Sequence, residues 1–236
     1  MGKTHLTPDD LAAIEAAVRR AEARTTGEIY CVAAEESSDY REAPLAWAAG
    51  AALLAPALLL LGGVHVEAPE ILGGWTAAQA AGAAETAVRG SLIGALLLQA
   101  VLFLAVLALA SIAPVRRALT PRALRRERVR RRAREMFAAK NLQATRERTG
   151  VLIYVSFAEH MAELIADESI AATVDPGVWD EAMALLTAGL KRGAPAAGFV
   201  AAVDRCADTL AERFPARAGD NPNELPDAVV VLPRLG

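Results

Sequence analysis

Acidic side chains that follow two predicted strands are the residues whose types best suit a metal site. These candidates are Asp39, Asp167, Glu168 and Asp175, with Glu35 and Glu36 beside Asp39. Loops that leave one edge of a sheet would bring several such carboxylates together, and calcium takes about six to eight oxygen ligands. No D-x-D-x-D-G loop fixes that geometry. The alternative is therefore that Asp175 caps a helix and the other acids are solvated loop residues.

Other catalytic patterns are absent from the sequence. The histidines His5, His65 and His160 are isolated, and none has a second histidine or a cysteine at helical spacing. No G-x-S-x-G, H-E-x-x-H or C-x-x-C motif occurs. Cys31 and Cys206 stand far apart and are typical of small buried residues in a reducing compartment. We therefore assign no catalytic residue. Calcium is the one cofactor for which the acidic residues are candidate ligands.

The composition separates a soluble domain from a concentrated apolar segment. The chain has 236 residues, of which 54% are hydrophobic, 5% aromatic and 22% charged. Residues 43–66 and 90–115 contain no Asp, Glu, Lys or Arg. Each stretch exceeds the about 20 residues that a helix needs to cross a bilayer, and neither has a polar face. A soluble hairpin would need more chain to cover it than is present, so we predict two membrane-spanning helices, at about 45–65 and 92–114.

Residues 116–134 contain ten arginines and one glutamate. Arginines that flank a span stay on the cytoplasmic side, so the C-terminal region and the N-terminus are predicted to be cytoplasmic and the 67–89 segment to lie outside. The residues closest to the span are expected to contact anionic lipid headgroups and fix topology: Arg116, Arg117, Arg122, Arg125 and Arg126. A nucleic-acid site would need interleaved aromatics, and only Phe137 is near, so no nucleic-acid partner is expected.

The regions on either side of the hairpin must combine, because the first supplies only one helix and one strand. Thr7 and Pro8 begin an amphipathic helix, which is followed by a strand at 28–34. After the basic segment we expect strands at 150–157 and near 161–166, helices at 178–190 and 196–214, a turn-like tail at 220–227, and a short strand at 229–232. Docking the strand at 28–34 beside 151–157 predicts an α/β fold, a small mixed-sheet sandwich interrupted by the transmembrane hairpin. The predicted parts are 1–42, the hairpin 43–115, an Arg-rich juxtamembrane helix 116–134, and 135–236.

The soluble parts resemble the TPM-domain family, over roughly residues 6–42 and 130–232. The segments that carry the resemblance are Thr26-Gly27-Glu28-Ile29, Arg148-Thr149-Gly150-Val151-Leu152-Ile153-Tyr154-Val155-Ser156, Trp179-Asp180 and Asn223-Glu224-Leu225-Pro226. The chain is similar to a bacterial subgroup with a membrane hairpin after the first strand. The resemblance implies an α/β sandwich that is often attached to membranes, and in some relatives calcium binding and a weak acid phosphatase activity. Most TPM domains lie on the lumenal or extracellular side, from which the predicted cytoplasmic placement departs.

These observations lead to one expected function and one alternative. We expect an integral inner-membrane protein whose cytoplasmic TPM-like domain binds other membrane proteins and assists the assembly or maintenance of a membrane complex. The alternative is a calcium-dependent, acid phosphatase-like hydrolase that uses the strand-end carboxylates. Faces of small residues in the spans, such as Gly50 with Ala55, would also allow the chain to form homo-oligomers.

Overall fold

The computed structural model describes residues 6–63, 77–217 and 225–234. Their backbone contacts divide the chain into two compact units. Residues 1–39 and 122–236 form the first, which we call the α/β unit, and residues 40–121 form the second, the helical unit. The α/β unit is therefore built from two segments that are separated in the sequence by the whole helical unit.

The first segment of the α/β unit contains α1 (Pro8–Glu22) and β1 (Glu28–Ala34). Thr7 caps α1 as predicted: its side chain accepts a hydrogen bond from the backbone of Asp10, and the Asp10 carboxylate accepts one from the backbone of Thr7. Isoleucine, tyrosine, cysteine and valine favour an extended chain in β1, and all seven residues of this strand are buried. A strand buried on both faces belongs in the interior of a sheet.

The sheet has four strands in the described residues, in the order β3-β2-β1-β4. Strand β2 (Gly150–Ser156) pairs in parallel with β1, with Glu28 opposite Gly150 and Ala34 opposite Ser156. Strand β4 (Val230–Leu232) pairs in parallel with the other side of β1. Strand β3 (Met161–Ala166) is antiparallel to β2, with Val151 opposite Ala166. The predicted mixed sheet and the predicted pairing of the two central strands are confirmed.

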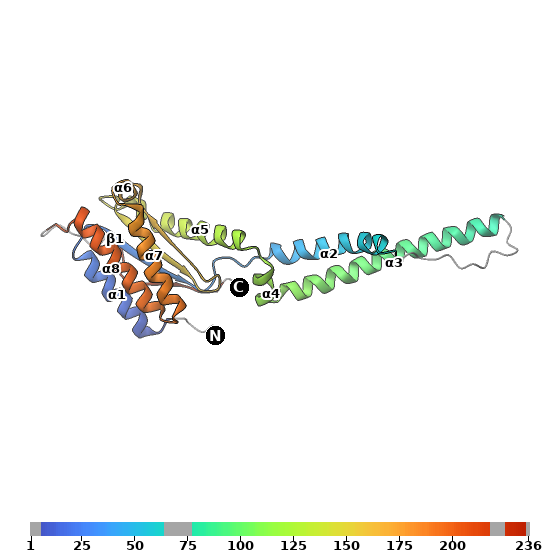
Figure 1. Ribbon diagram of the computed structural model, residues 1–236, viewed down its shortest axis with the longest axis horizontal. Helices are drawn as coiled ribbons and strands as arrows, with labels where there is room; N and C mark the ends of the chain where they lie inside the picture. Colours follow the sequence, from blue (N-terminus) through green and yellow to red (C-terminus); the bar gives the residue numbers. More distant parts are fainter. Residues whose placement is uncertain (1–5, 64–76, 218–224, 235–236) are drawn as a thin grey trace. The chain divides into compact units, whose positions relative to one another are not determined.

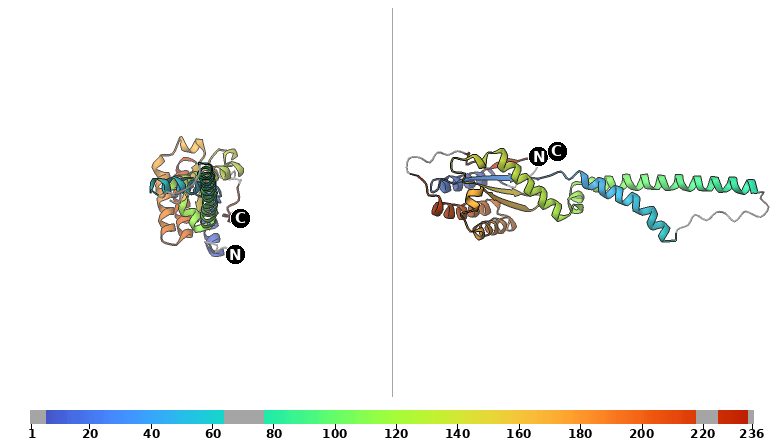
Figure 2. Two further views of the ribbon diagram at one scale, coloured as in Figure 1. Left: turned by 90° about the vertical axis from the view of Figure 1, so that its right-hand side faces the viewer. Right: turned by 90° about the horizontal axis from the view of Figure 1, so that it is seen from above.

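Helices cover both faces of this sheet (Figure 1, Figure 2). On one face, α1, α7 (Pro176–Lys191) and α8 (Pro195–Arg213) pack against Ile29, Cys31 and Ala33 of β1. On the other face, α5 (Arg122–Ala139) packs Val129, Ala133 and Met136 against the alternate residues of β1 and β2. A 3₁₀ turn, η1 (Leu142–Ala144), follows α5. The unit is thus a three-layer α/β arrangement with one hydrophobic core on each side of the sheet.

Helices α7 and α8 approach each other closely through two glycines. A Cβ added to Gly189 would lie 2.4 Å from the Cα of Gly198. A Cβ added to Gly198 would lie 2.8 Å from the carbonyl oxygen of Leu186. Only residues without a side chain fit at these positions, so the glycines bring the two helix backbones into direct contact.

The helical unit contains α2 (Glu42–Leu61), α3 (Ala77–Ser111) and α4 (Ala113–Leu119). The helices α2 and α3 are long and apolar enough to cross a membrane. Their most apolar stretches are Glu42–Leu59, in which 17% of the residues are buried, and Val88–Ser111, in which none is buried. Leucines such as Leu53, Leu58 and Leu96 are therefore exposed, as expected for helices that meet hydrocarbon rather than water.

Two predicted elements differ in the structure. Residues 77–89, predicted as part of a connecting loop, are helical and extend α3, because this alanine-rich stretch has a high helix propensity. The Arg-rich segment forms two helices rather than one, because Pro121 disfavours a helical Thr120, whose ψ is 123°. Residues 64–65 of the predicted first span, 67–76 of the predicted loop and 220–224 of the predicted tail lie outside the described residues.

Candidate functional site

A buried polar network lies where the carboxyl ends of the parallel strands β1 and β2 meet. Ser37 follows β1, and its hydroxyl lies 2.9 Å from the Tyr154 hydroxyl and donates to the Ser156 hydroxyl at 2.7 Å. Ser156 in turn donates to Oε2 of Glu159. The backbone N–H of Ser37 donates to the same oxygen at 3.3 Å. All four residues come from the carboxyl end of the sheet, where open α/β sheets commonly bind ligands.

The direction of these hydrogen bonds follows from the number of protons available. Ser156 gives its only proton to Glu159, and Ser37 gives its only proton to Ser156. Tyr154 must then be the donor to Ser37. Burial raises the pKa of the Tyr154 hydroxyl above its ordinary value, and the hydrogen bond with Ser37 partly offsets this. Tyr154 therefore keeps its proton, and the network ends on Oε2 of Glu159, which accepts from Ser156 and from the Ser37 backbone.

A cavity of about 400 Å³ borders this network on the face of the sheet covered by α7 and α8. Its apolar lining comes from both sheet and helices, and consists of Val155, Phe157, Ala162, Leu190 and Pro195. Ser156, Thr187 and the exposed residues His160 and Lys191 complete the lining. An apolar cavity with a few polar groups is the usual form of a small-molecule site.

The predicted acidic cluster is divided between opposite ends of the sheet. Because β3 runs antiparallel to β2, Asp167 lies beside the start of β2, where its backbone N–H donates to the Gly150 carbonyl at 3.0 Å. Asp39 instead follows the other end of β1, since Ala34 pairs with Ser156. Seven-residue strands separate these ends by roughly 20 Å at about 3.3 Å per residue. The expectation that Asp39 and Asp167 meet at one edge is therefore wrong.

The remaining metal candidates have local structural roles. Asp167 caps α6 (Glu168–Ala171), where its side chain accepts from the Ser169 backbone at 3.1 Å. Asp175 caps α7 by accepting from the Gly177 backbone at 2.7 Å, and Glu168 lies in the first turn of α6. Across the described ranges, no group of three or more His, Cys, Asp or Glu side chains is placed to hold a metal ion. Asp167 and Asp175 therefore act as helix N-caps.

The predicted lipid-contacting arginines are divided between two helices. Arg116 and Arg117 belong to α4, and Arg122, Arg125 and Arg126 begin α5. The structure adds a regular pattern: an exposed row at four-residue spacing on α5, formed by Arg122, Arg126, Arg130 and Arg134. Within the described part of the chain, none of these four makes an ion pair. The row is therefore an uncompensated positive face about 18 Å long, at 1.5 Å per helical residue.

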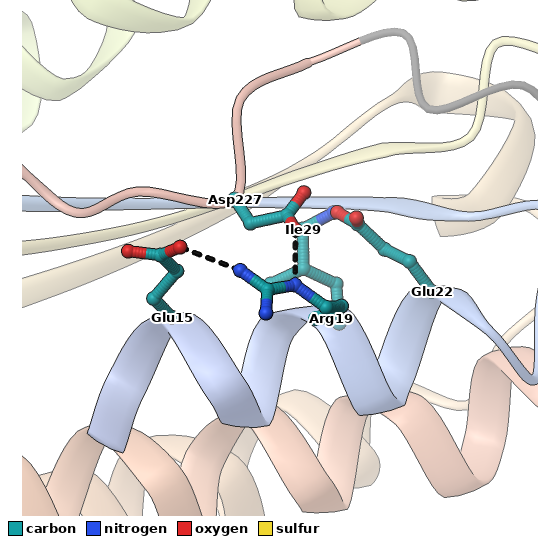
Figure 3. Close-up of polar contacts among 5 residues, drawn as sticks. All are labelled: Glu15, Arg19, Glu22, Ile29 and Asp227. Atoms are coloured by element: carbon teal, nitrogen blue, oxygen red, sulfur yellow. Dashed lines mark hydrogen bonds and ion pairs between the residues drawn. The ribbon is translucent and has the colours of Figure 1, made fainter. Parts of the chain in front are cut away.

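A cluster of titratable side chains, separate from the polar network around Ser156, lies where α1 meets β1 and the segment before β4 (Figure 3). Arg19 pairs with Glu15 at 2.6 Å and with Asp227 at 3.2 Å. Glu22, one turn further along α1, is buried, and this burial raises its pKa to about 9, with the charges of Glu28 and Asp227 adding to the effect. Glu22 therefore keeps its proton at neutral pH.

Sequence reasoning missed both the polar network around Ser156 and the cluster around Glu22. Glu22 had a signal, because it continues the row of Ile14 and Val18 on the apolar face of α1. Ser156 had a weaker signal as the one polar residue closing an apolar strand. The contact of Ser37 with Glu159 joins residues 122 positions apart and has no local signature.

Comparisons with known proteins bear on the fold alone. No protein-family model matches the chain, and a search of curated proteins found no match. Among solved structures, the chain is similar to the NMR structure of the BA42 protein from the psychrophilic bacterium Bizionia argentinensis. That match has a TM-score of 0.56 and 18% sequence identity, and covers 98% of this chain and 98% of the other.

Fold and site together define a class of protein: an α/β domain with a mixed sheet, whose chain also carries two helices apolar enough to enter a membrane. Its distinctive features are the polar network and cavity at the carboxyl end of the parallel strands.

Proposed function

We propose that this chain is an integral inner-membrane protein whose α/β unit is a cytoplasmic TPM-like domain that binds other membrane proteins during assembly or maintenance of a membrane complex. The observation that carries the proposal is the exposed apolar surface of α2 and α3, followed directly by the arginines of α4 and α5. Helices with this composition are unfavourable in water, and arginines after a span favour retention on the cytoplasmic side.

The arginines also suit a membrane surface better than a nucleic acid. Arg116 and Arg117 come within six residues of the end of α3 at Ser111, inside the range where positive charge determines topology. The row on α5 continues this charge, and Phe137 is the one aromatic residue in the sequence of α5. Anionic headgroups need charge without stacking, whereas single-stranded nucleic acids use both.

The hydrolase alternative loses support from the geometry. It requires Asp39 and Asp167 to act on one substrate, and these residues follow opposite ends of the sheet. The buried Glu159 is engaged by Ser37 and Ser156 and holds the chain after β1 in place. A protein-binding role needs no catalytic group. It is therefore compatible with the separation of Asp39 from Asp167 and with the structural role of Glu159.

Cysteine labelling tests the topology, because the two natural thiols are expected to be unreactive toward a maleimide. Cys31 and Cys206 are buried, and burial raises the pKa of both thiols, to about 12 for Cys206, so the reactive thiolate is scarce. We would add one exposed thiol, Glu85→Cys in α3 or Ala184→Cys in α7, and treat spheroplasts with a membrane-impermeant maleimide. In intact spheroplasts we expect labelling of Glu85→Cys but not of Ala184→Cys. After permeabilisation we expect labelling of both variants. Labelling of Ala184→Cys in intact spheroplasts would reject the cytoplasmic placement.

The binding role is tested by cross-linking in native membranes followed by purification of the tagged chain. We expect one membrane-protein partner at a fixed ratio, and no phosphomonoester hydrolysis with or without calcium. Hydrolysis that is lost in the Asp39→Asn/Asp167→Asn double variant, with the chain recovered alone, would favour the enzyme instead.

A further inference from the structure

The cavity at the carboxyl end of β2 is large enough for a small ligand. Its volume is about 400 Å³. At about 30 Å³ per water molecule, this corresponds to roughly thirteen water-sized groups, so there is room for a ligand of about ten non-hydrogen atoms. The lining belongs to β2, β3, the turn between them, and the adjoining ends of α7 and α8, all within the α/β unit.

The inner wall suits a hydrocarbon chain. Val155, Ala162 and Leu190 contribute apolar residues, and the hydroxyls of the two lining residues that carry one, Ser156 and Thr187, are already engaged. Ser156 belongs to the polar network, and the Thr187 hydroxyl donates to the Met183 carbonyl one turn back in α7. A ligand rich in hydroxyl groups would find few free partners on this wall and would lose hydrogen bonds to water.

The polar groups left available lie at the mouth of the cavity. His160 and Lys191 have exposed side chains, and in the described residues neither side chain makes a hydrogen bond or ion pair. His160 adopts a left-handed conformation, with φ of 53°, in the short turn that joins β2 to β3. Lys191 is the last residue of α7 and lines the same cavity. A cationic lysine and an imidazole donor at the rim complement one negative charge.

We propose that this cavity binds a small anionic amphiphile, with a single short apolar chain against Val155, Ala162 and Leu190 and its carboxylate at the rim on Lys191 and His160. Apolar burial supplies most of the affinity, and the charge at the rim determines orientation and selects anions over neutral chains. This inference does not depend on the membrane topology or on the binding role proposed above.

The test uses octanoate, which has ten non-hydrogen atoms, and 1-octanol as its neutral counterpart. The full chain is placed in lipid nanodiscs, because detergent monomers are themselves amphiphiles and would compete. Binding of radiolabelled ligand is measured by equilibrium dialysis, with empty nanodiscs subtracted. We expect saturable binding of one octanoate per chain, and at least tenfold weaker binding of octanol.

Two variants separate the wall from the rim. The Lys191→Gln/His160→Gln variant changes exposed side chains and should weaken octanoate at least tenfold while leaving octanol unchanged. Ala162→Trp fills the cavity and should abolish binding of both, with circular dichroism confirming that the sheet is retained. Equal affinity for octanoate and octanol, no saturable binding above empty nanodiscs, or full binding by a folded Ala162→Trp chain would each overturn the proposal.

Discussion

The backbone N–H of Ile29 donates a 3.2 Å hydrogen bond to Oε1 of Glu22, which ties the last turn of α1 to the second residue of β1 (Figure 3). This bond favours the ionised carboxyl group, but burial and the nearby Glu28 and Asp227 outweigh it, so the pKa is about 9. A neutral carboxylic acid thus holds the junction between helix and strand.

The first prediction concerns pH. Glu22 has an ordinary pKa of 4.5, so above about pH 4.5 the unfolded chain releases a proton that the folded chain keeps until about pH 9. The contribution of Glu22 to the free energy of unfolding is fully present below pH 4.5. It is lost as the pH rises to about 9, by up to about 1.4 kcal/mol per pH unit. Glu22→Gln should flatten this decline and raise the unfolding temperature at pH 8.

Thermal unfolding of the full chain in nanodiscs between pH 5 and 9 measures the effect. Glu15→Gln is the matched control, because Glu15 lies on α1, is exposed, and contacts Arg19 rather than the buried acids. We expect it to change the free energy of unfolding by less than about 0.5 kcal/mol. A native chain whose stability is constant over this range would contradict the buried neutral acid.

The second prediction compares two buried tyrosines on neighbouring strands. The Tyr154 hydroxyl donates to Ser37, whereas the Tyr30 hydroxyl is buried and has no hydrogen-bond partner among the described residues. Tyr154→Phe should cost about 1 kcal/mol of unfolding free energy. Tyr30→Phe should be neutral or stabilising, because it removes an unsatisfied hydroxyl and keeps the ring on which Lys140 lies, 5.9 Å from its centre. Chemical denaturation of both variants checks this, and equal losses would refute the assigned network.

The third prediction concerns the contact between α7 and α8. Gly189→Ala should destabilise the α/β unit by at least about 1–3 kcal/mol, because its Cβ would lie 2.4 Å from the Cα of Gly198 and the two helices must separate. Gly90→Ala in α3 is the control, since no atom lies within 4 Å of its added Cβ. Hydrogen exchange of the α8 backbone amides measures this loss of stability. Unchanged protection in Gly189→Ala would show that the helices do not touch there.

The fourth prediction rests on the proposed topology. Replacing the arginines nearest α3 with glutamine should increase the fraction of inverted chains, because these residues supply the positive charge beside the span. The five positions are Arg116, Arg117, Arg122, Arg125 and Arg126. The readout is labelling of Ala184→Cys in spheroplasts. Replacement of Arg134, Lys140 and Arg146, which lie more than about 20 residues beyond Ser111, should have no effect. Equal effects would argue against a topological role for the first set.

Local patterns predicted most of the elements, because their signals lie within a few residues. The Thr7 cap with Pro8 correctly placed the start of α1, and the helix predicted at 178–190 begins two residues earlier, at Pro176. The strand at Glu28–Ala34 was predicted with its observed bounds. These features depend on backbone conformation that neighbouring side chains fix.

The arrangement of the acids was predicted wrongly although the sequence held the signal. Only residues 157–160 separate β2 from β3, and a parallel crossover needs about a dozen residues or more. The two strands therefore had to be antiparallel, which places Asp167 at the opposite end from Asp39. The network of Ser37 with Glu159 could not be found in this way, because it depends on how distant segments pack.

The split of the α/β unit also determines the order in which the molecule is made. Strand β1 leaves the ribosome before any residue of α2, α3 or α5, yet its parallel neighbour β2 begins only at Gly150. At roughly 5–20 residues per second, β1 waits on the order of ten seconds without a partner. Each of its residues is buried in the finished sheet, so during synthesis this apolar strand is a hazard for aggregation until β2 arrives. The helical unit is thus synthesised in full before the sheet that contains β1 can form.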